Sequence, residues 1–345
     1  NDWQSALVPI YLNTVEWAQP LHGSASIYSI HNLAYQGVFA PSMIPVTGLG
    51  FEHLNPHELE HFGTLNLTNA ELSRIVFGWS GITLGNTGST GALNLGTWTW
   101  DDALTVTTNS GAITAAATTM LTNNSLTLTS TSGVITVNGA TLGTGGSMSI
   151  NANANVIIAG NISGSSTGTL TISSGTAGAT FGIGDTMTGN VNLTNAELAY
   201  IQSNWGNVVF GSTSITGAMN IGNYTWNNAN VFFRTSTGIM TIAGATMGNN
   251  NLTLSTDGNL AINGALSGGS GTLTIRASKN TTVTAIGDGQ TGTLQVSSTE
   301  LANIQSNWAN VVIGHSALTG VTNVGAMNWS NNLTFISNTG AININ

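Results

Sequence analysis

The chain has no cysteine, which excludes disulfide bonds, thiol catalysis and thiolate metal sites together. Charge is scarce as well, since Asp, Glu, Lys and Arg make up 5% of the residues, against roughly 25% in an average globular domain. The four basic residues besides histidine are Arg74, Arg234, Arg276 and Lys279, and thirteen acidic residues outnumber them. Because so few cations cannot neutralise a run of phosphates, we expect neither a nucleic-acid partner nor attachment to an anionic membrane surface.

Long apolar runs are missing too, because no stretch approaches the roughly 18 residues that span a bilayer. We therefore expect no membrane insertion, and any signal peptide would precede Asn1. The chain does contain 44 glycines and 41% hydrophobic residues among its 345 positions. This composition can build a core whose surface is made of Thr, Ser and Asn instead of charged side chains.

The composition changes near residue 62. All five prolines and five of the six histidines lie in the first 62 residues. Beyond that point, short apolar pairs alternate with Gly, Thr, Ser and Asn throughout. We therefore predict two domains, residues 1–62 and residues 63–345.

The second domain contains three long repeats. They read "GTLNLTNAELSRIVFGW" from Gly63, "GNVNLTNAELAYIQSNW" from Gly189 and "GTLQVSSTELANIQSNW" from Gly292. A Thr followed three residues later by Glu fits the spacing of a helix capping box, as in Thr194 and Glu197 or Thr68 and Glu71. We predict a single helical turn at each such place, with a polar loop anchored by a leucine as the alternative. The tryptophans that end the repeats stand once per unit beside apolar neighbours, so we interpret Trp79, Trp205 and Trp308 as structural.

A shorter period runs inside the long repeats. The pairs that begin at Leu126, Met148 and Leu170 are 22 residues apart, and those at Leu252 and Leu273 are 21 residues apart. Each pair alternates apolar with polar, as a strand does, and two short strands with turns in about 21 residues make one coil of a solenoid. We therefore predict an all-β fold, a parallel β-helix of about 13 coils, in which stacked Asn and Thr replace charges that would repel.

The repeats resemble those of bacterial filamentous-haemagglutinin-type adhesins and related autotransporter passengers, in their G-x-L-x-L strands, their "LTNAEL" segments and their missing cysteine. The resemblance implies a right-handed β-helix and a secreted or bacterial cell-surface location. It implies no catalytic residue and no cofactor. The expected partner is a glycan or protein on a host or cell surface, which the sequence does not name.

The first domain resembles a different family. "NDWQSALVPIYL" at the start, "IHNLAYQGVF" at 30–39 and "LNPHELEHFGTLNL" at 54–67 are similar to the N-terminal domain of bacterial glycogen and plant starch synthases. The resemblance implies a short α/β fragment of an enzyme that transfers glucose from ADP-glucose to an α-1,4-glucan. Asp2 matches an element near the acceptor cleft, and His31 and Asn32 match the active-site loop.

The sequence departs from that family in two respects. The Lys-x-Gly-Gly-Leu nucleotide-sugar loop is not in the sequence, nor is the second nucleotide-binding domain with its phosphate-binding cations. Because nothing then stabilises a departing diphosphate, we expect Asp2, His31 and Asn32 to be non-functional and the chain not to be an enzyme. A glycosyltransferase function carried by the first domain is the alternative.

A zinc site is considered and rejected. His57, Glu58 and His61 match the pattern H-E-x-x-H, in which two histidines on one helix face bind zinc and the glutamate activates water. Pro56 separates this segment from His53, and the only histidine further along the chain is His315. The same letters already follow the synthase text.

Three further functions are weighed and set aside. A β-helical polysaccharide lyase or hydrolase needs clustered carboxylates, but Asp101 and Asp102 are the only adjacent acidic pair after residue 62. The threonines of "SLTLTSTS" at 125–132 suggest ice binding, but they do not continue at a fixed spacing. Calcium-binding nonapeptides would form an array, whereas "GDGQTG" at 287–292 occurs once.

The two domains meet in text that suits both families. "GTLNLT" at 63–68 is similar to the synthase sequence and to the later repeats alike. We hypothesise a chimeric chain joined between Gly63 and Thr68, by natural fusion or by an error of sequence assembly.

Overall fold

The computed structural model describes residues 65–66, 69–75 and 77–345. Two compact units divide the chain, Asn1–Gly63 and Thr64–Asn345, and every described element belongs to the second. The α/β fragment expected for residues 1–62 lies outside the described residues. Among those described, no helix is long and apolar enough to cross a membrane.

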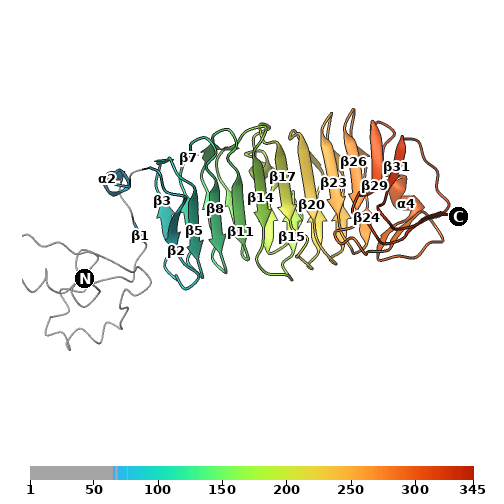
Figure 1. Cartoon of the computed structure of the whole chain (residues 1–345), viewed down its shortest axis with the longest axis horizontal. Helices are drawn as coiled ribbons and strands as arrows, with labels where there is room; N and C mark the ends of the chain where they lie inside the picture. Colours follow the sequence, from blue (N-terminus) through green and yellow to red (C-terminus); the bar gives the residue numbers. More distant parts are fainter. Residues whose placement is uncertain (1–64, 67–68, 76) are drawn as a thin grey trace, which may run out of the picture. The chain divides into compact units, whose positions relative to one another are not determined.

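The second unit is a parallel β-solenoid, as the period predicts (Figure 1). In one coil the chain runs through β8 (Leu126–Ser130), β9 (Ile135–Val137) and β10 (Ala140–Leu142), which belong to three different sheets. It then enters β11 (Met148–Ala152), which lies beside β8 with Met148 paired to Leu126. All pairings between the described strands are parallel. The predicted all-β fold and parallel coil are therefore confirmed.

The first side of the coil is one continuous sheet of 11 strands. In spatial order its strands are β2 (Ile82–Gly85), β5 (Leu104–Thr108), β8, β11, β14 (Thr169–Ser173), β17 (Asn207–Gly211), β20 (Asn230–Arg234), β23 (Asn251–Ser255), β26 (Thr272–Arg276), β29 (Asn310–Gly314) and β31 (Leu333–Ile336).

The second side is divided into three sheets. They are β1 (Leu65–Asn66), β3 (Leu93–Leu95), β6 (Ile113–Ala115), β9 and β12 (Val156–Ile158); then β16 (Val191–Leu193), β15 (Phe181–Ile183), β18 (Met219–Ile221), β21 (Met240–Ile242) and β24 (Leu260–Ile262); then β28 (Leu294–Val296), β27 (Thr284–Ile286), β30 (Thr322–Val324) and β32 (Ile342–Ile344).

The third side has two sheets of short strands. They are β13 (Ile162–Ser163), β10, β7 (Thr118–Met120) and β4 (Thr99–Trp100), and then β19 (Tyr224–Thr225), β22 (Ala245–Thr246) and β25 (Leu266–Ser267).

Alternation of side chains explains the strands. In β5 and β8, buried residues alternate with half-buried ones, so that Leu104 and Leu126 point inward and stack at 1% and 0% exposure. At the inner ends of these strands Thr108 donates a hydrogen bond of 3.0 Å to Ser130 on the next coil. Hydroxyls can pair in this way between stacked coils, whereas like charges in register would repel. The shortage of charge thus follows from the stacking.

Two coils are longer than the rest. Thr169 in β14 and Asn207 in β17 are neighbours in the 11-stranded sheet although 38 residues separate them. The extra residues carry the chain twice through the second side, because β15 is followed after a short loop by the parallel strand β16. The strand β16 also contacts β12, so it fills the level between β12 and β15. The pair β27 and β28 repeats this detour, which is why the longest sheet has 11 strands instead of the predicted 13 or so.

The predicted helical turns are present. They are α2 (Asn69–Leu72), α3 (Asn195–Leu198) and α4 (Ser298–Leu301). The helix α3 has a complete capping box, in which Thr194 accepts from the Glu197 amide and the Glu197 carboxylate accepts from the Thr194 amide. A second oxygen of Glu197 accepts from the amide of Ile158 at 3.3 Å, which ties this turn to β12. The helix α4 has the same box, and Thr68, proposed for α2, lies outside the described residues.

In the second long repeat the final tryptophan seals the contact with the preceding coil. Trp205 is 1% exposed, and its Nε1 donates a hydrogen bond of 3.1 Å to the carbonyl oxygen of Ile162. Its indole lies so close over Gly164 that a Cβ there would stand 2.4 Å from a ring carbon. Asn204 fixes the same glycine, donating to its carbonyl and accepting from its amide. Only glycine leaves room for the ring at this position.

The third repeat has the same contact, and the first does not. Trp308 donates to the carbonyl of Leu266 at 3.0 Å and covers Gly268. Trp79, by contrast, is 60% exposed. The structural interpretation is therefore confirmed for Trp205 and Trp308 and is wrong for Trp79, because no preceding coil covers that ring among the described residues.

Candidate ligand-binding face

The outer face of the 11-stranded sheet carries the side chains that alternate with the core. One register position, followed from strand to strand, gives an outward ladder along the whole sheet. Its members are Thr83, Thr105, Thr127, Ser149, Thr171, Val209, Phe232, Thr253, Thr274, Val312 and Thr334. Hydroxyls therefore line the first five strands, and apolar and aromatic side chains interrupt them afterwards.

This hydroxyl array is more regular than the sequence analysis expects. A second ladder two residues further along each strand adds Thr107, Thr129, Asn151 and Ser173. The constant 22-residue coils from β5 to β14 keep these positions in register. The 38-residue coil that follows brings Val209 into the first ladder, where the hydroxyl array ends.

A cluster of cationic side chains follows on the same face. Arg234 ends β20 and Arg276 ends β26, and Ser255 of β23 stands between them in register. The guanidinium group of Arg234 lies over the Phe232 ring, with Cζ 4.7 Å from the ring centroid. His315 comes directly after β29. We call Phe232, Arg234, Arg276 and His315 the cationic cluster.

The cluster is not neutralised by the protein around it. The Nε atoms of Arg234 and Arg276 and the Nε2 of His315 are buried and have no hydrogen-bond partner among the described residues. Burial lowers the pKa of Arg234, and the positive charge of Arg276 lowers this pKa further. Burial and then Arg276 lower the pKa of His315 in the same way. Each of these groups is held in an environment that lacks a counter-charge.

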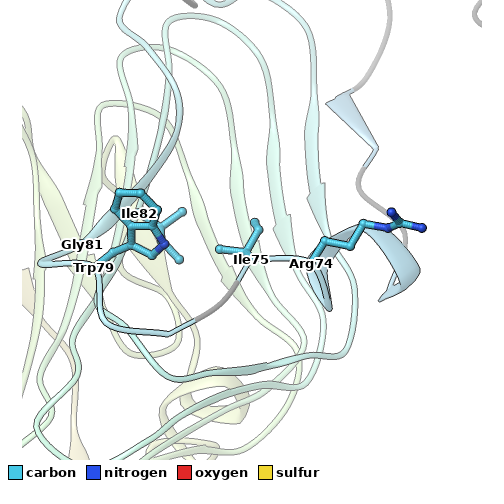
Figure 2. A pocket seen from close by; sticks show the side chains of 5 residues that line it. All are labelled: Arg74, Ile75, Trp79, Gly81 and Ile82. Atoms are coloured by element: carbon cyan, nitrogen blue, oxygen red, sulfur yellow. The ribbon is translucent and has the colours of Figure 1, made fainter. Parts of the chain in front are cut away.

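The largest hollow lies elsewhere, at the end of the solenoid where the described residues begin. It measures about 380 Å³ and is lined by Arg74, Ile75, Trp79, Gly81 and Ile82. Figure 2 shows the Arg74 side chain pointing away from the space between Ile75 and Trp79. The hollow is therefore an apolar, open depression and offers no group for acid–base chemistry.

The residues that the sequence analysis selects are not brought together by the described structure. Asp2, His31, Asn32, His57, Glu58 and His61 all lie outside the described residues. Asp102 is buried at 7% exposure and accepts from the Gly78 amide at 3.1 Å, whereas Asp101 is exposed. In the part of the chain that the structure describes, no group of three or more His, Asp or Glu residues could hold a metal ion.

The comparisons with known proteins concern the first domain. The family described as "Starch synthase catalytic domain" matches residues 1–74. The glycogen synthase of Rhodopirellula baltica is 46% identical over 70 residues, and that of Thermotoga maritima is 45% identical over 67 residues. Each match covers 19% of this chain and 13% or 14% of the relative, so the chain spans about one seventh of the length of these enzymes. No solved structure matches the chain.

The synthase match and the solenoid overlap. The match extends to residue 74, but β1 pairs with β3 of the solenoid and α2 occupies the place that α3 and α4 take in the later repeats. Residues 65–74 thus resemble one family in sequence and belong to the solenoid in structure. The overlap agrees with a join in text that both parents share.

The sequence analysis missed the cationic cluster. Its signal was present, because Arg234 and Arg276 are 42 residues apart, which is two coils of 21. Read with the period, this spacing places both side chains on one face with a single coil between them. His315 had no such signal, since the 38-residue coil before β29 breaks the period.

Proposed function

We propose that the chain is a structural or adhesive protein of the filamentous-haemagglutinin type, secreted or exposed on a bacterial surface. The observation that carries this proposal is the uninterrupted 11-stranded parallel sheet with its outward hydroxyl ladder and cationic cluster. Such a surface suits contact with an extended ligand, because ligand-contacting groups recur along one line instead of converging on a pocket. The likeness of the repeats to adhesin sequences supports the same function.

The solenoid also suits the role of a spacer. Strands at about 4.8 Å per level make the 11-stranded sheet roughly 48 Å long. Each inner strand is hydrogen-bonded on both sides, and the apolar residues of successive coils stack on one another. This arrangement resists bending, so a ligand-binding face would be held at a fixed distance from its attachment point.

The proposal is tested by labelling intact cells of the source organism with an antibody raised against the solenoid. Labelling without permeabilisation is the expected result, and a cytoplasmic protein labelled in parallel serves as the control for lysis. Signal that appears only after permeabilisation would contradict a surface location.

The match to glycogen synthases favours one alternative, glucosyl transfer by the first domain. The match covers only the N-terminal fragment of the chain, so we propose that the chain transfers no glucose from ADP-glucose to glycogen. Transfer above background by the full chain would favour the alternative function.

A further inference from the structure

Cations gather in one place in this chain although it has few of them. Two of its three arginines and the histidine of the solenoid stand on the last strands of one sheet face, within a chain of formal net charge −9. We infer that the cationic cluster binds the oxyanions of an acidic polysaccharide laid along the solenoid axis. This inference rests on the proposed function, because it names the class of ligand that the same face takes.

The geometry of the two arginines carries the inference. They stand two strands apart, which is roughly 10 Å at about 4.8 Å per strand. The residues next to them in register are small, Gly211 on one side of Arg234 and Ser255 on the other. Neither neighbour can neutralise a guanidinium group, and both leave its surface open to an anion. A line of cations separated by regular steps fits a polymer with recurring anionic groups.

The unsatisfied donors point to the same ligand. Arginine donates through a planar fork that matches a carboxylate or sulfate with two parallel hydrogen bonds. A buried donor without a partner is costly, so an incoming oxyanion would supply what Arg234, Arg276 and His315 lack. The acidic residue nearest to the arginines in sequence, Asp257, is already engaged, since it accepts from the Lys279 amide at 2.8 Å and from the Thr282 hydroxyl at 2.6 Å.

The surroundings suit a saccharide. Phe232 offers an aromatic ring on the outer face, and Thr253 and Thr274 continue its ladder with hydroxyls on the next two strands. An aromatic ring can stack on the apolar face of a sugar while hydroxyls exchange hydrogen bonds with its polar edge. The ring already lies beneath Arg234, so stacking and charge recognition would occur side by side.

The test is titration calorimetry of the full chain at low salt with polygalacturonate, dextran sulfate and neutral dextran. We expect binding to at least one of the two acidic polymers and none to dextran. Polygalacturonate offers carboxylates and dextran sulfate offers sulfates, so the preference between them identifies the oxyanion. Because the chain as a whole is anionic, non-specific attraction to a polyanion is small.

Single substitutions decide whether the cluster is responsible. Arg234→Gln and Arg276→Gln are each expected to weaken binding roughly tenfold or more, because each removes a charge-assisted pair of hydrogen bonds. Arg74→Gln removes the same charge at the other end of the solenoid and is the matched control, with an expected change below about twofold. Arg234→Lys, which keeps the charge and loses the fork, should fall between wild type and Arg234→Gln. Melting curves confirm that each variant folds.

Several results would overturn the inference. They are an equal loss for Arg74→Gln, binding to neutral dextran as strong as to the acidic polymers, an absence of polymer binding, or thermal stabilisation by inorganic sulfate without polymer binding. These outcomes are separable from failure of the proposed function. Surface labelling together with unaffected variants removes only this inference, whereas specific polyanion binding by an intracellular protein removes only the proposed location.

Discussion

Replacement of Trp205 by alanine is expected to lower the free energy of unfolding of the solenoid by about 3–5 kcal/mol, which is the usual loss for a large buried aromatic side chain. The ring is fully enclosed and donates its one hydrogen bond to the Ile162 carbonyl of the preceding coil. Without it, Gly164 and Gly168 face an empty space where the indole stood. The loss therefore falls on the contact between two coils, at the place where the 38-residue detour returns to the stack.

Trp79 provides the control for this experiment. It occupies the same position in the first long repeat but is 60% exposed. Trp79→Ala should change the free energy of unfolding by no more than about 0.5 kcal/mol, as exposed substitutions usually do. Denaturant titration followed by circular dichroism measures both variants. Equal losses at the two positions would show that burial against the preceding coil is not what the tryptophan contributes.

Deletion of residues 126–147, one complete 22-residue coil, is expected to leave a folded solenoid. The deletion removes β8, β9 and β10 together, one strand from each side. The strand β5 would then meet β11 with Leu104 opposite Met148, which is the register that each already makes with β8. Because a repeat contacts only its neighbours, the new joint restores one interface of the same kind for the two that are lost.

The matched control deletes half a coil, residues 126–136. This shorter deletion removes β8 and most of β9 and leaves β10 without a coil to join. We expect the half-coil variant to aggregate or to melt at least about 10 °C below the full-coil variant, because strands shifted out of register expose their apolar side chains. Both proteins are compared by circular dichroism melting. A half-coil deletion as stable as the full-coil deletion would argue against a stacked repeat.

The sequence predicted the parallel coil because its period is set by local physics. Inward residues such as Leu126 and Met148 can stack only if every coil has the same length, so the spacing in the sequence is the spacing in space. The capping boxes were predictable for the same reason, since Thr194 and Glu197 act on each other over one turn.

The detours were not predictable in this way. The strand β16 lies between β12 and β15 although it follows β15 in the chain, and no residue of "VNL" at 191–193 indicates which level it fills. That choice depends on long-range contacts such as the hydrogen bond of 3.0 Å from the Asn192 amide to Asn155. The exposure of Trp79 is also a property of its neighbours, since its repeat resembles the buried cases in sequence.

The cationic cluster was missed because its members were read as isolated charges. Arg234 and Arg276 become neighbours only when the chain is folded into coils, with Ser255 between them. The absence of a partner for their Nε atoms can be seen only in three dimensions. Composition alone had shown that cations were scarce, and it had not shown that they were gathered.

The stacking itself is tested most directly by distances between spin labels on the outer ladder. The chain has no cysteine, so Thr127→Cys can be labelled in pairs with Thr253→Cys, Thr274→Cys or Thr334→Cys. These positions share one register and lie five, six and eight strands from β8. At about 4.8 Å per strand, the backbone separations should rise as roughly 24, 29 and 38 Å with narrow distributions. Distances that do not increase in this order, or that are broad for all three pairs, would contradict the solenoid.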